Sequence, residues 1–178
     1  DMKSEEELAA LKASKQGWAC VGHKLDYAHR AWIQPGHWLT SDMQKANEDA
    51  AALYESWKKD VQVEEYRLED AEVVLTAYGI SARICKSAVE LLRAQGVKAG
   101  LIRPITVHPF PYAAYDHIDY SKVKAVLDVE MSIPAQFVDD VAAAVKDRCP
   151  IETCLCSGGN IMSRDKVLAA VKKIMEGK

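Results

Sequence analysis

The sequence has 178 residues, of which 49% are hydrophobic and 28% are charged, the balance of a soluble globular protein. A formal net charge of −3 and a pI near 6.0 offer no basic surface to nucleic acid. No window reaches the roughly 18 consecutive apolar residues of a membrane helix, and no signal peptide opens the chain. We therefore expect no nucleic-acid or membrane partner.

The five cysteines lack the spacing of a disulfide framework and include no CxxC motif, so iron–sulfur or zinc ligation within this chain is not expected. This cysteine usage indicates a reducing, cytoplasmic compartment. Cys154 and Cys156 form a C-x-C pair in an apolar run. On a strand both side chains point to one face, so we expect them to act as two small core residues.

Residues 1–61 are interpreted as a linker arm. The first 40 show no regular pattern, but three tryptophans and three histidines gather there around a Gln-Pro-Gly turn: Trp18, Trp32, Trp38, His23, His29 and His37. The histidines lack the i, i+4 spacing of a helical metal site, so tryptophan packing on another surface is favoured over metal binding. Apolar residues then recur every three or four positions and predict one amphipathic helix at about 41–60, capped by Thr40 or Ser41.

Residues 62–178 alternate apolar strands with helices. A helix capped by Ser81 and ended by Gly96 is predicted first. Another begins at Pro134 and stops before Pro150, and a last one is capped by Ser163. Strands are predicted at 71–78, 97–102, 122–130 and 151–156. Strands apolar on both faces and separated by helices predict a three-layer α/β/α domain with a mostly parallel sheet.

The carboxyl ends of the predicted strands are where an open parallel sheet binds ligands. The turn at Ser81 lacks the three glycines of a dinucleotide fingerprint, and Gly158-Gly159 lacks the Lys-Ser pair of a phosphate loop. Either turn could still hold a small anion at a helix start, and that alternative stays open. Four acids near one strand end are expected to be solvated: Asp128, Glu130, Asp139 and Asp140. Without a G-x-S-x-G or HExxH motif, we expect no catalytic, cofactor-binding or metal residue in this chain.

The stretch DAEVVLTAYGISARICKSAVELLRAQGVKAGLIRPITVHPFP resembles the carboxyl-terminal domain of the α subunit of 2-oxoacid:ferredoxin oxidoreductases, most closely the 2-ketoisovalerate type. The most specific piece is IRPIT-x-x-PFP. Val129-Glu130-Met131, the stretch from Gln136 to Val141, and Ser157-Gly158-Gly159 resemble later family motifs. Two departures are His108, where the family usually has an aromatic residue, and Ile133-Pro134-Ala135, which replaces a small-residue turn and could alter the following helix start.

The resemblance implies a domain like the carboxyl-terminal domain of transketolase, whose usual roles are subunit packing and shaping the access side. It implies an enzyme that uses thiamine diphosphate, magnesium, iron–sulfur clusters and coenzyme A to decarboxylate a 2-oxoacid oxidatively and reduce ferredoxin. Those cofactors would be held by other subunits or domains. This chain would then be an inactive, non-catalytic assembly domain, and it could form a homodimer.

The proline loop at 104–111 can be interpreted in two ways. Arg103 could pair with a carboxylate across a subunit interface while Phe110 anchors a neighbouring polypeptide, or both could serve this domain's own surface and core. Other candidates for an interface or access side are His108, Ser81, Arg83, Gly158 and Gly159. Two alternative functions stay open: a free-standing α/β module for a small anion or nucleotide, and an interaction scaffold from an unrelated system.

Overall fold

The computed structural model describes residues 3–15, 36 and 39–177. The chain divides into two compact units, residues 1–51 and 52–178. The first unit contains helix α1 (Glu5–Lys15), which contradicts the expectation that the first 40 residues are irregular. The backbone N–H of Glu7 donates to the Ser4 hydroxyl at 3.2 Å, and the N–H of Ser4 donates to the Glu7 carboxylate at 2.7 Å. This reciprocal capping box is a helix-start signal that the composition alone did not reveal.

The helix predicted at about 41–60 is α2 (Thr40–Trp57), followed by the short 3-10 helix η2 (Lys58–Asp60). The predicted cap is wrong, because α2 already includes Thr40 and Ser41. Its apolar stripe is not buried either. None of its residues is buried, and Leu53 remains 51% exposed.

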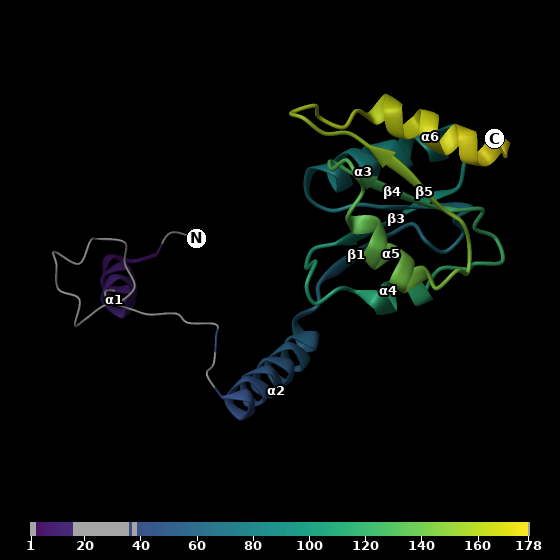
Figure 1. Cartoon of the computed structure of the whole chain (residues 1–178). Helices are drawn as coiled ribbons and strands as arrows, with labels where there is room; N and C mark the ends of the chain where they lie inside the picture. Colours follow the sequence, from purple (N-terminus) through teal and green to yellow (C-terminus); the bar gives the residue numbers. More distant parts are fainter. Residues whose placement is uncertain (1–2, 16–35, 37–38, 178) are drawn as a thin grey trace. The chain divides into compact units, whose positions relative to one another are not determined.

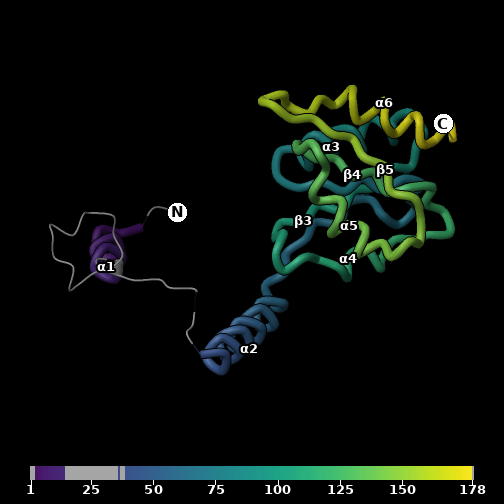
Figure 2. Tube along the Cα trace, in the orientation of Figure 1, coloured from purple at the N-terminus to yellow at the C-terminus, as the bar shows by residue number. Residues whose placement is uncertain are grey.

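The second unit is built on one five-stranded sheet with the order β1-β3-β2-β4-β5 (Figures 1 and 2). The four predicted strands are confirmed: three are shorter than expected, and the strand predicted at 97–102 keeps its length but lies two residues later. They run parallel as β2 (Val73–Thr76), β3 (Ala99–Pro104), β4 (Val126–Glu130) and β5 (Ile151–Leu155). Strand β1 (Val63–Tyr66) was not predicted; it pairs antiparallel with β3 at the sheet edge. Its two central residues, Glu64 and Glu65, are charged, so the segment lacks the run of apolar residues by which the other strands were predicted.

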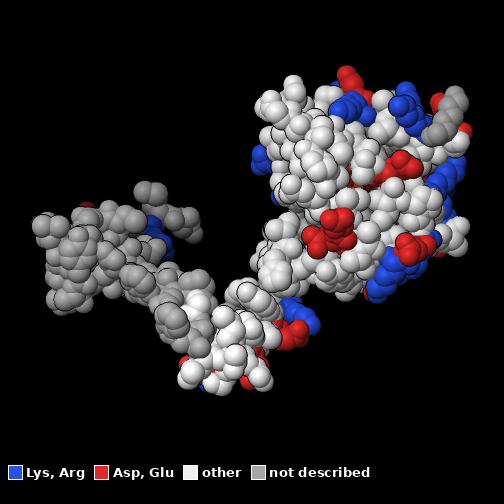
Figure 3. Space-filling model, in the orientation of Figure 1, with Lys and Arg blue, Asp and Glu red and all other residues white. Residues whose placement is uncertain are grey.

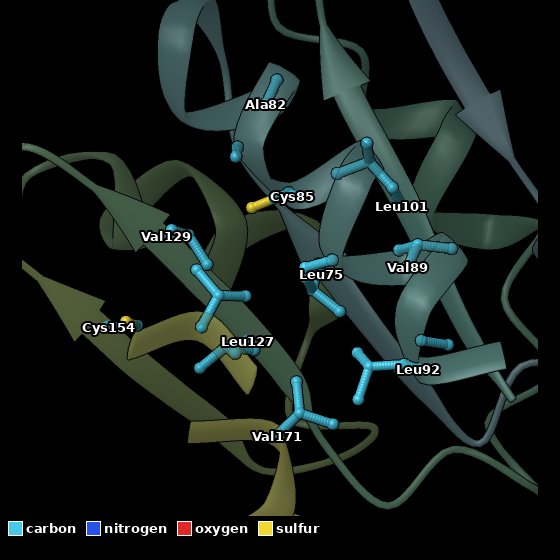
Figure 4. Packing of buried hydrophobic residues seen from close by; sticks show 14 of the residues in the cluster. Leu75, Ala82, Cys85, Val89, Leu92, Leu101, Leu127, Val129, Cys154 and Val171 are labelled. Atoms are coloured by element: carbon cyan, nitrogen blue, oxygen red, sulfur yellow. The ribbon is translucent and has the colours of Figure 1, made fainter. Parts of the chain in front are cut away.

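Helices cover both faces of the sheet, as the α/β/α prediction requires (Figure 1). Helices α3 (Gly79–Ala94) and α6 (Arg164–Glu176) share one core with the sheet, shown in Figure 4. Cys154 and Cys156 are buried in that core, which confirms their predicted packing. Helices α4 (Tyr112–Asp116) and α5 (Phe137–Val145) share the core on the opposite face. Helix α4 was not predicted.

Two of the predicted helix starts are wrong. Helix α3 begins at Gly79, so Ser81 lies within its first turn, where it is buried. Helix α5 begins at Phe137 and not at Pro134. In contrast, the Lys166 N–H donates to the Ser163 hydroxyl at 3.2 Å, which confirms the predicted cap of α6.

Glycine at position 100 is required by a close approach between β3 and the turn before β2. A Cβ atom there would lie 2.8 Å from the Arg67 carbonyl oxygen and 2.9 Å from the Leu68 side chain. Only a residue without Cβ allows these backbones to pack so closely.

Candidate functional site

The candidate site lies at the carboxyl ends of β2 and β4. The chain proceeds from β2 to β3 on one side and reaches β4 on the other, so this pair of strands is the topological switch point of the sheet. A hollow of about 160 Å³ opens there. It is lined by the start of α3, the residues after β4 and the residue before α5: Tyr78, Gly79, Ile80, Ser81, Glu130, Met131, Ser132 and Gln136.

Glu130 closes the inner end of this hollow and holds the start of α5. Its side chain is 1% exposed. Its carboxylate accepts hydrogen bonds from the backbone N–H of Gln136 at 2.8 Å and of Phe137 at 3.1 Å, and from the Ser132 hydroxyl. Burial by itself would raise the pKa of Glu130, but hydrogen bonds from Ser132, Asp128 and the two amides outweigh it and lower the pKa. The carboxylate thus acts as the cap of α5.

Asp128 lies two residues earlier on the same face of β4. It is fully buried, and neither carboxyl oxygen has a hydrogen-bond donor among the described residues. Burial, followed by the neighbouring Glu130 carboxyl, raises the pKa of Asp128 to about 8. A protonated Asp128 can donate a hydrogen bond to Glu130, whereas two carboxylates can only accept. The pair therefore holds one proton at neutral pH.

A second polar pair lies on the same side of the sheet. The hydroxyl groups of Thr76 and Tyr115 are hydrogen bonded at 2.6 Å, and both residues are fully buried. Burial raises the pKa of the Tyr115 phenol, so it stays protonated. Thr76 is the register partner of Asp128 across β2 and β4. Asp128 with Glu130 and Thr76 with Tyr115 therefore form two buried polar pairs on one side of the sheet.

The expectation of four solvated acids is therefore wrong for Asp128 and Glu130 and correct for Asp139 and Asp140, which are exposed. A signal was present in the sequence. The two buried acids are separated by one residue in a strand that is otherwise apolar, so they share a face of that strand. Acids at such positions must be protonated or fully hydrogen bonded.

The proline loop is tied to its own domain. Arg103 Nη1 pairs with Glu64 Oε2 on β1 at 3.1 Å, and Lys86 also contacts Glu64. The backbone N–H groups of Ile105 and Thr106 donate to the Gln62 carbonyl at 3.0 and 3.1 Å. These bonds attach the loop to the segment before β1.

Phe110 is 6% exposed and stacks on Tyr115 at 5.5 Å between ring centroids. Phe110 thus lies in the domain's own core, as the second of the two interpretations of the loop has it. Both Arg103 and Phe110 thus contact residues of their own domain, Glu64 and Tyr115. The Arg103 Nε atom nevertheless remains buried without an acceptor among the described residues.

His108 packs as an aromatic residue. Its ring lies edge-on to Tyr54 at 5.7 Å and to Trp57 at 5.9 Å, both at the end of α2 and within the same unit. The histidine thus occupies a position where the family usually has an aromatic residue, and it fills that position with an aromatic contact.

The remaining candidate residues do not converge on the hollow. Arg83 lines an open depression of about 350 Å³ between α3 and α6, together with Arg164 and Asp165. Gly158 and Gly159 have φ angles of +66° and +84° and form an exposed turn after β5. Arg83, Gly158 and Gly159 therefore lie outside the lining of the hollow.

Trp18, Trp32, Trp38, His23, His29 and His37, with Cys20, lie outside the described residues. Within the described ranges, no group of three or more His, Cys, Asp or Glu side chains could hold a metal ion. No described helix is both long and apolar enough to cross a membrane.

The sequence matches the family model of pyruvate:ferredoxin oxidoreductase core domain II over residues 71–167. Ketoisovalerate oxidoreductase subunit VorB of Methanothermobacter marburgensis is 40% identical over 117 residues, which are 66% of this chain and 32% of that subunit. The 2-oxoglutarate synthase subunit KorA of the same organism is 31% identical over 110 residues, 62% of this chain and 29% of that subunit. The matched part thus spans about a third of these curated relatives.

Among solved structures, the 2-oxoglutarate:ferredoxin oxidoreductase of Magnetococcus marinus superposes with a TM-score of 0.64 at 20% identity, covering 78% of this chain and 24% of that chain. A split-gene transketolase superposes with a TM-score of 0.52 at 19% identity, covering 64% of this chain and 41% of that chain. These two likenesses concern the fold and confirm the transketolase-like architecture. With the family model matching more than half of its length, the chain belongs to the pyruvate:ferredoxin oxidoreductase core domain II family.

Proposed function

We propose that this chain is an assembly domain, without a catalytic centre of its own, of a cytoplasmic 2-oxoacid:ferredoxin oxidoreductase that acts on a branched-chain 2-oxoacid such as 2-ketoisovalerate. Thiamine diphosphate with magnesium, and the iron–sulfur clusters, belong to other domains or subunits. The complete enzyme converts the 2-oxoacid and coenzyme A to an acyl-CoA and carbon dioxide while ferredoxin accepts the electrons. The partners of this chain are the polypeptides that hold those cofactors.

The observation that carries the proposal is the higher identity to a ketoisovalerate subunit, 40%, than to a 2-oxoglutarate subunit, 31%, over segments of similar length. The site geometry supports the non-catalytic part. Pockets that bind small molecules usually measure about 300–1,000 Å³. The hollow at the switch point, of about 160 Å³, is smaller, and its inner end is occupied by the Glu130 carboxylate.

The residues of this hollow do not fit thiamine diphosphate. A diphosphate needs cationic or free N–H donors, yet the lining includes no Lys or Arg and one carboxylate. The hollow does not fit a small anion either, because Ser81 is buried and the amides at the start of α5 already donate to Glu130. The similarity to subunits of larger oxidoreductases disfavours a free-standing module.

Calorimetric titration tests the assignment directly. Thiamine diphosphate with Mg²⁺ is added to the chain alone, and no binding heat is expected. A micromolar dissociation constant would contradict the proposal.

Substrate choice is tested in the complex assembled with the thiamine-binding and iron–sulfur polypeptides. Ferredoxin reduction that depends on coenzyme A should proceed faster with 2-ketoisovalerate than with pyruvate or 2-oxoglutarate. A preference for 2-oxoglutarate would refute the substrate class without affecting the domain assignment.

A further inference from the structure

The exposed large apolar side chains of residues 62–177 all lie at one edge of the sheet. There are eight of these side chains, and each lies in a segment that follows the carboxyl end of one of the four parallel strands. One from each strand end illustrates the pattern: Ile80 is 54% exposed, Val107 51%, Ile133 61% and Ile161 68%. We name this surface the carboxyl-end face and define it by residues 77–82, 104–112, 131–138 and 156–163.

The carboxyl-end face is also uncharged. None of its 31 residues is Asp, Glu, Lys or Arg. At the opposite edge, thirteen of the 27 residues in the turns 67–72, 93–98, 116–125 and 146–150 are charged. Figure 3 shows the same contrast as a broad uncoloured area on the left of this unit, where the parallel strands end in Figure 1. A water-exposed edge has no physical reason to exclude charge, whereas the centre of an interface does.

The exposed area is large enough for a stable contact. Eight half-exposed side chains of this size present on the order of 700 Å² in total, taking about 90 Å² for each. That approaches the roughly 800 Å² that each partner contributes to a specific interface of standard size. It exceeds the few hundred Å² of apolar patch that monomeric proteins normally expose.

We infer that the carboxyl-end face is covered by the part of the oxidoreductase subunit that the curated relatives carry beyond the matched third. This inference rests on the proposed function. The VorB subunit extends over about three times the matched length, so in the proposed enzyme there is a further body of comparable or larger size that can pack on this domain. The amino-terminal edge is charged, and the carboxyl-end face is the surface that lacks charge. The hollow of about 160 Å³ lies within it and is bordered by Tyr78 and Met131.

A partner that covers this face needs a largely apolar surface, because none of the 31 residues that define the face carries a charge to pair with one on the partner. One of its side chains can enter the hollow, in the way that interface anchors fill pockets. The partner would also convert a domain with an exposed apolar edge into a continuous core.

Hydroxyl-radical footprinting with mass spectrometry tests the inference. It compares the 178-residue chain with the oxidoreductase purified through a tag on this chain. Tyr78 and Met131, 43% and 38% exposed, report on the face. Tyr66 and Met175, both partly buried, are the controls at the opposite edge: Tyr66 pairs with Leu101 near the start of β3, and the Met175 carbonyl accepts a hydrogen bond from Lys124. Oxidation of the first pair should fall roughly fivefold in the assembly, in proportion to burial below about a tenth of their surface, with a smaller change in the controls.

The thiamine diphosphate and iron contents of the purified assembly distinguish a failure of the inference about the carboxyl-end face from a failure of the proposed function. An assembly that contains both cofactors but leaves Tyr78 and Met131 as reactive as in the isolated chain overturns the inference and leaves the proposed function intact. Absence of both cofactors overturns the proposed function itself. Protection already present in the isolated chain would place the arm or a second copy on the face and also overturn the inference; light scattering identifies the dimer.

Substitution provides an independent readout. Ile80→Asp and Ile161→Asp alter exposed side chains, so circular dichroism of each isolated variant should match the original chain. In the assembly each should weaken association at least about tenfold. Leu53→Asp, at 51% exposure on α2, is the matched control and should assemble normally. Normal assembly of both isoleucine variants would refute the inference.

Discussion

Asp128 makes the stability of this domain depend on pH in an unusual direction. Its carboxyl has an ordinary pKa of 3.8, which burial raises to about 8 in the folded protein. Between these values the folded state holds a proton that the unfolded state has lost. Stability is therefore fully present below the ordinary value and falls as the pH rises, by up to about 1.4 kcal/mol per pH unit until the folded pKa is reached. The pKa of Glu130 is lowered from 4.5, so the stability that this group contributes changes only below about pH 4.5, outside the pH range of 5 to 9 used for the measurement below.

The variant Asp128→Asn isolates this contribution. The asparagine amide is neutral at all pH values and can donate to Glu130 as the protonated acid does. At pH 5, 1.2 units above the ordinary pKa of 3.8, the variant should already be more stable than the original chain by about 1.6 kcal/mol. By pH 8 this difference should grow by up to about 4 kcal/mol more, the sum over the three units from pH 5 to 8, and it should then level off.

Urea unfolding followed by circular dichroism at each pH from 5 to 9 measures this difference. Asp139→Asn, which removes an exposed acid from the first turn of α5, is the control and should give the same small change at every pH. A difference between Asp128→Asn and the original chain that stays constant from pH 5 to 9 would show that Asp128 is not protonated in the folded domain.

Three further predictions concern packing and hydrogen bonding. Gly100→Ala should lower the free energy of unfolding by about 1–3 kcal/mol, because the new Cβ meets the Arg67 carbonyl at 2.8 Å; unchanged urea midpoints would refute this contact. Glu130→Ala should lower it by about 2–4 kcal/mol by leaving buried donors such as the Phe137 N–H unpaired, with Glu130→Gln less affected; equal losses would contradict the capping role. Burial raises the pKa of the Cys85 thiol, so thiol reagents should modify it only at the rate of unfolding. Rapid labelling of the native chain would show otherwise.

Local chemistry was enough to predict the architecture from the sequence. Apolar runs separated by helical periodicity identified all four parallel strands, since strands covered on both faces have no polar side to hide the pattern. Ser163 and Gly96 were assigned correctly because their roles depend on neighbouring backbone groups alone. Strand β1 was missed since a half-exposed edge strand can carry two adjacent glutamates without disturbing the core.

The helix starts and the site depended on contacts between distant segments. Helix α5 begins at Phe137 because the carboxylate of Glu130, seven residues earlier and on a strand, receives its first amides. A local reading assigned that start to Pro134. Whether Phe110 faced a partner or its own core was likewise decided by Tyr115, which the unpredicted helix α4 places beside it.

The sequence by itself determined the fold class and the family, because strand and helix patterns and the IRPIT-x-x-PFP motif are properties of contiguous residues. Only the tertiary structure decided that Asp128 and Glu130 are buried and that four uncharged loops form one face. The reason is geometric: parallel strands bring their carboxyl ends to the same edge, so loops far apart in the chain become neighbours in space.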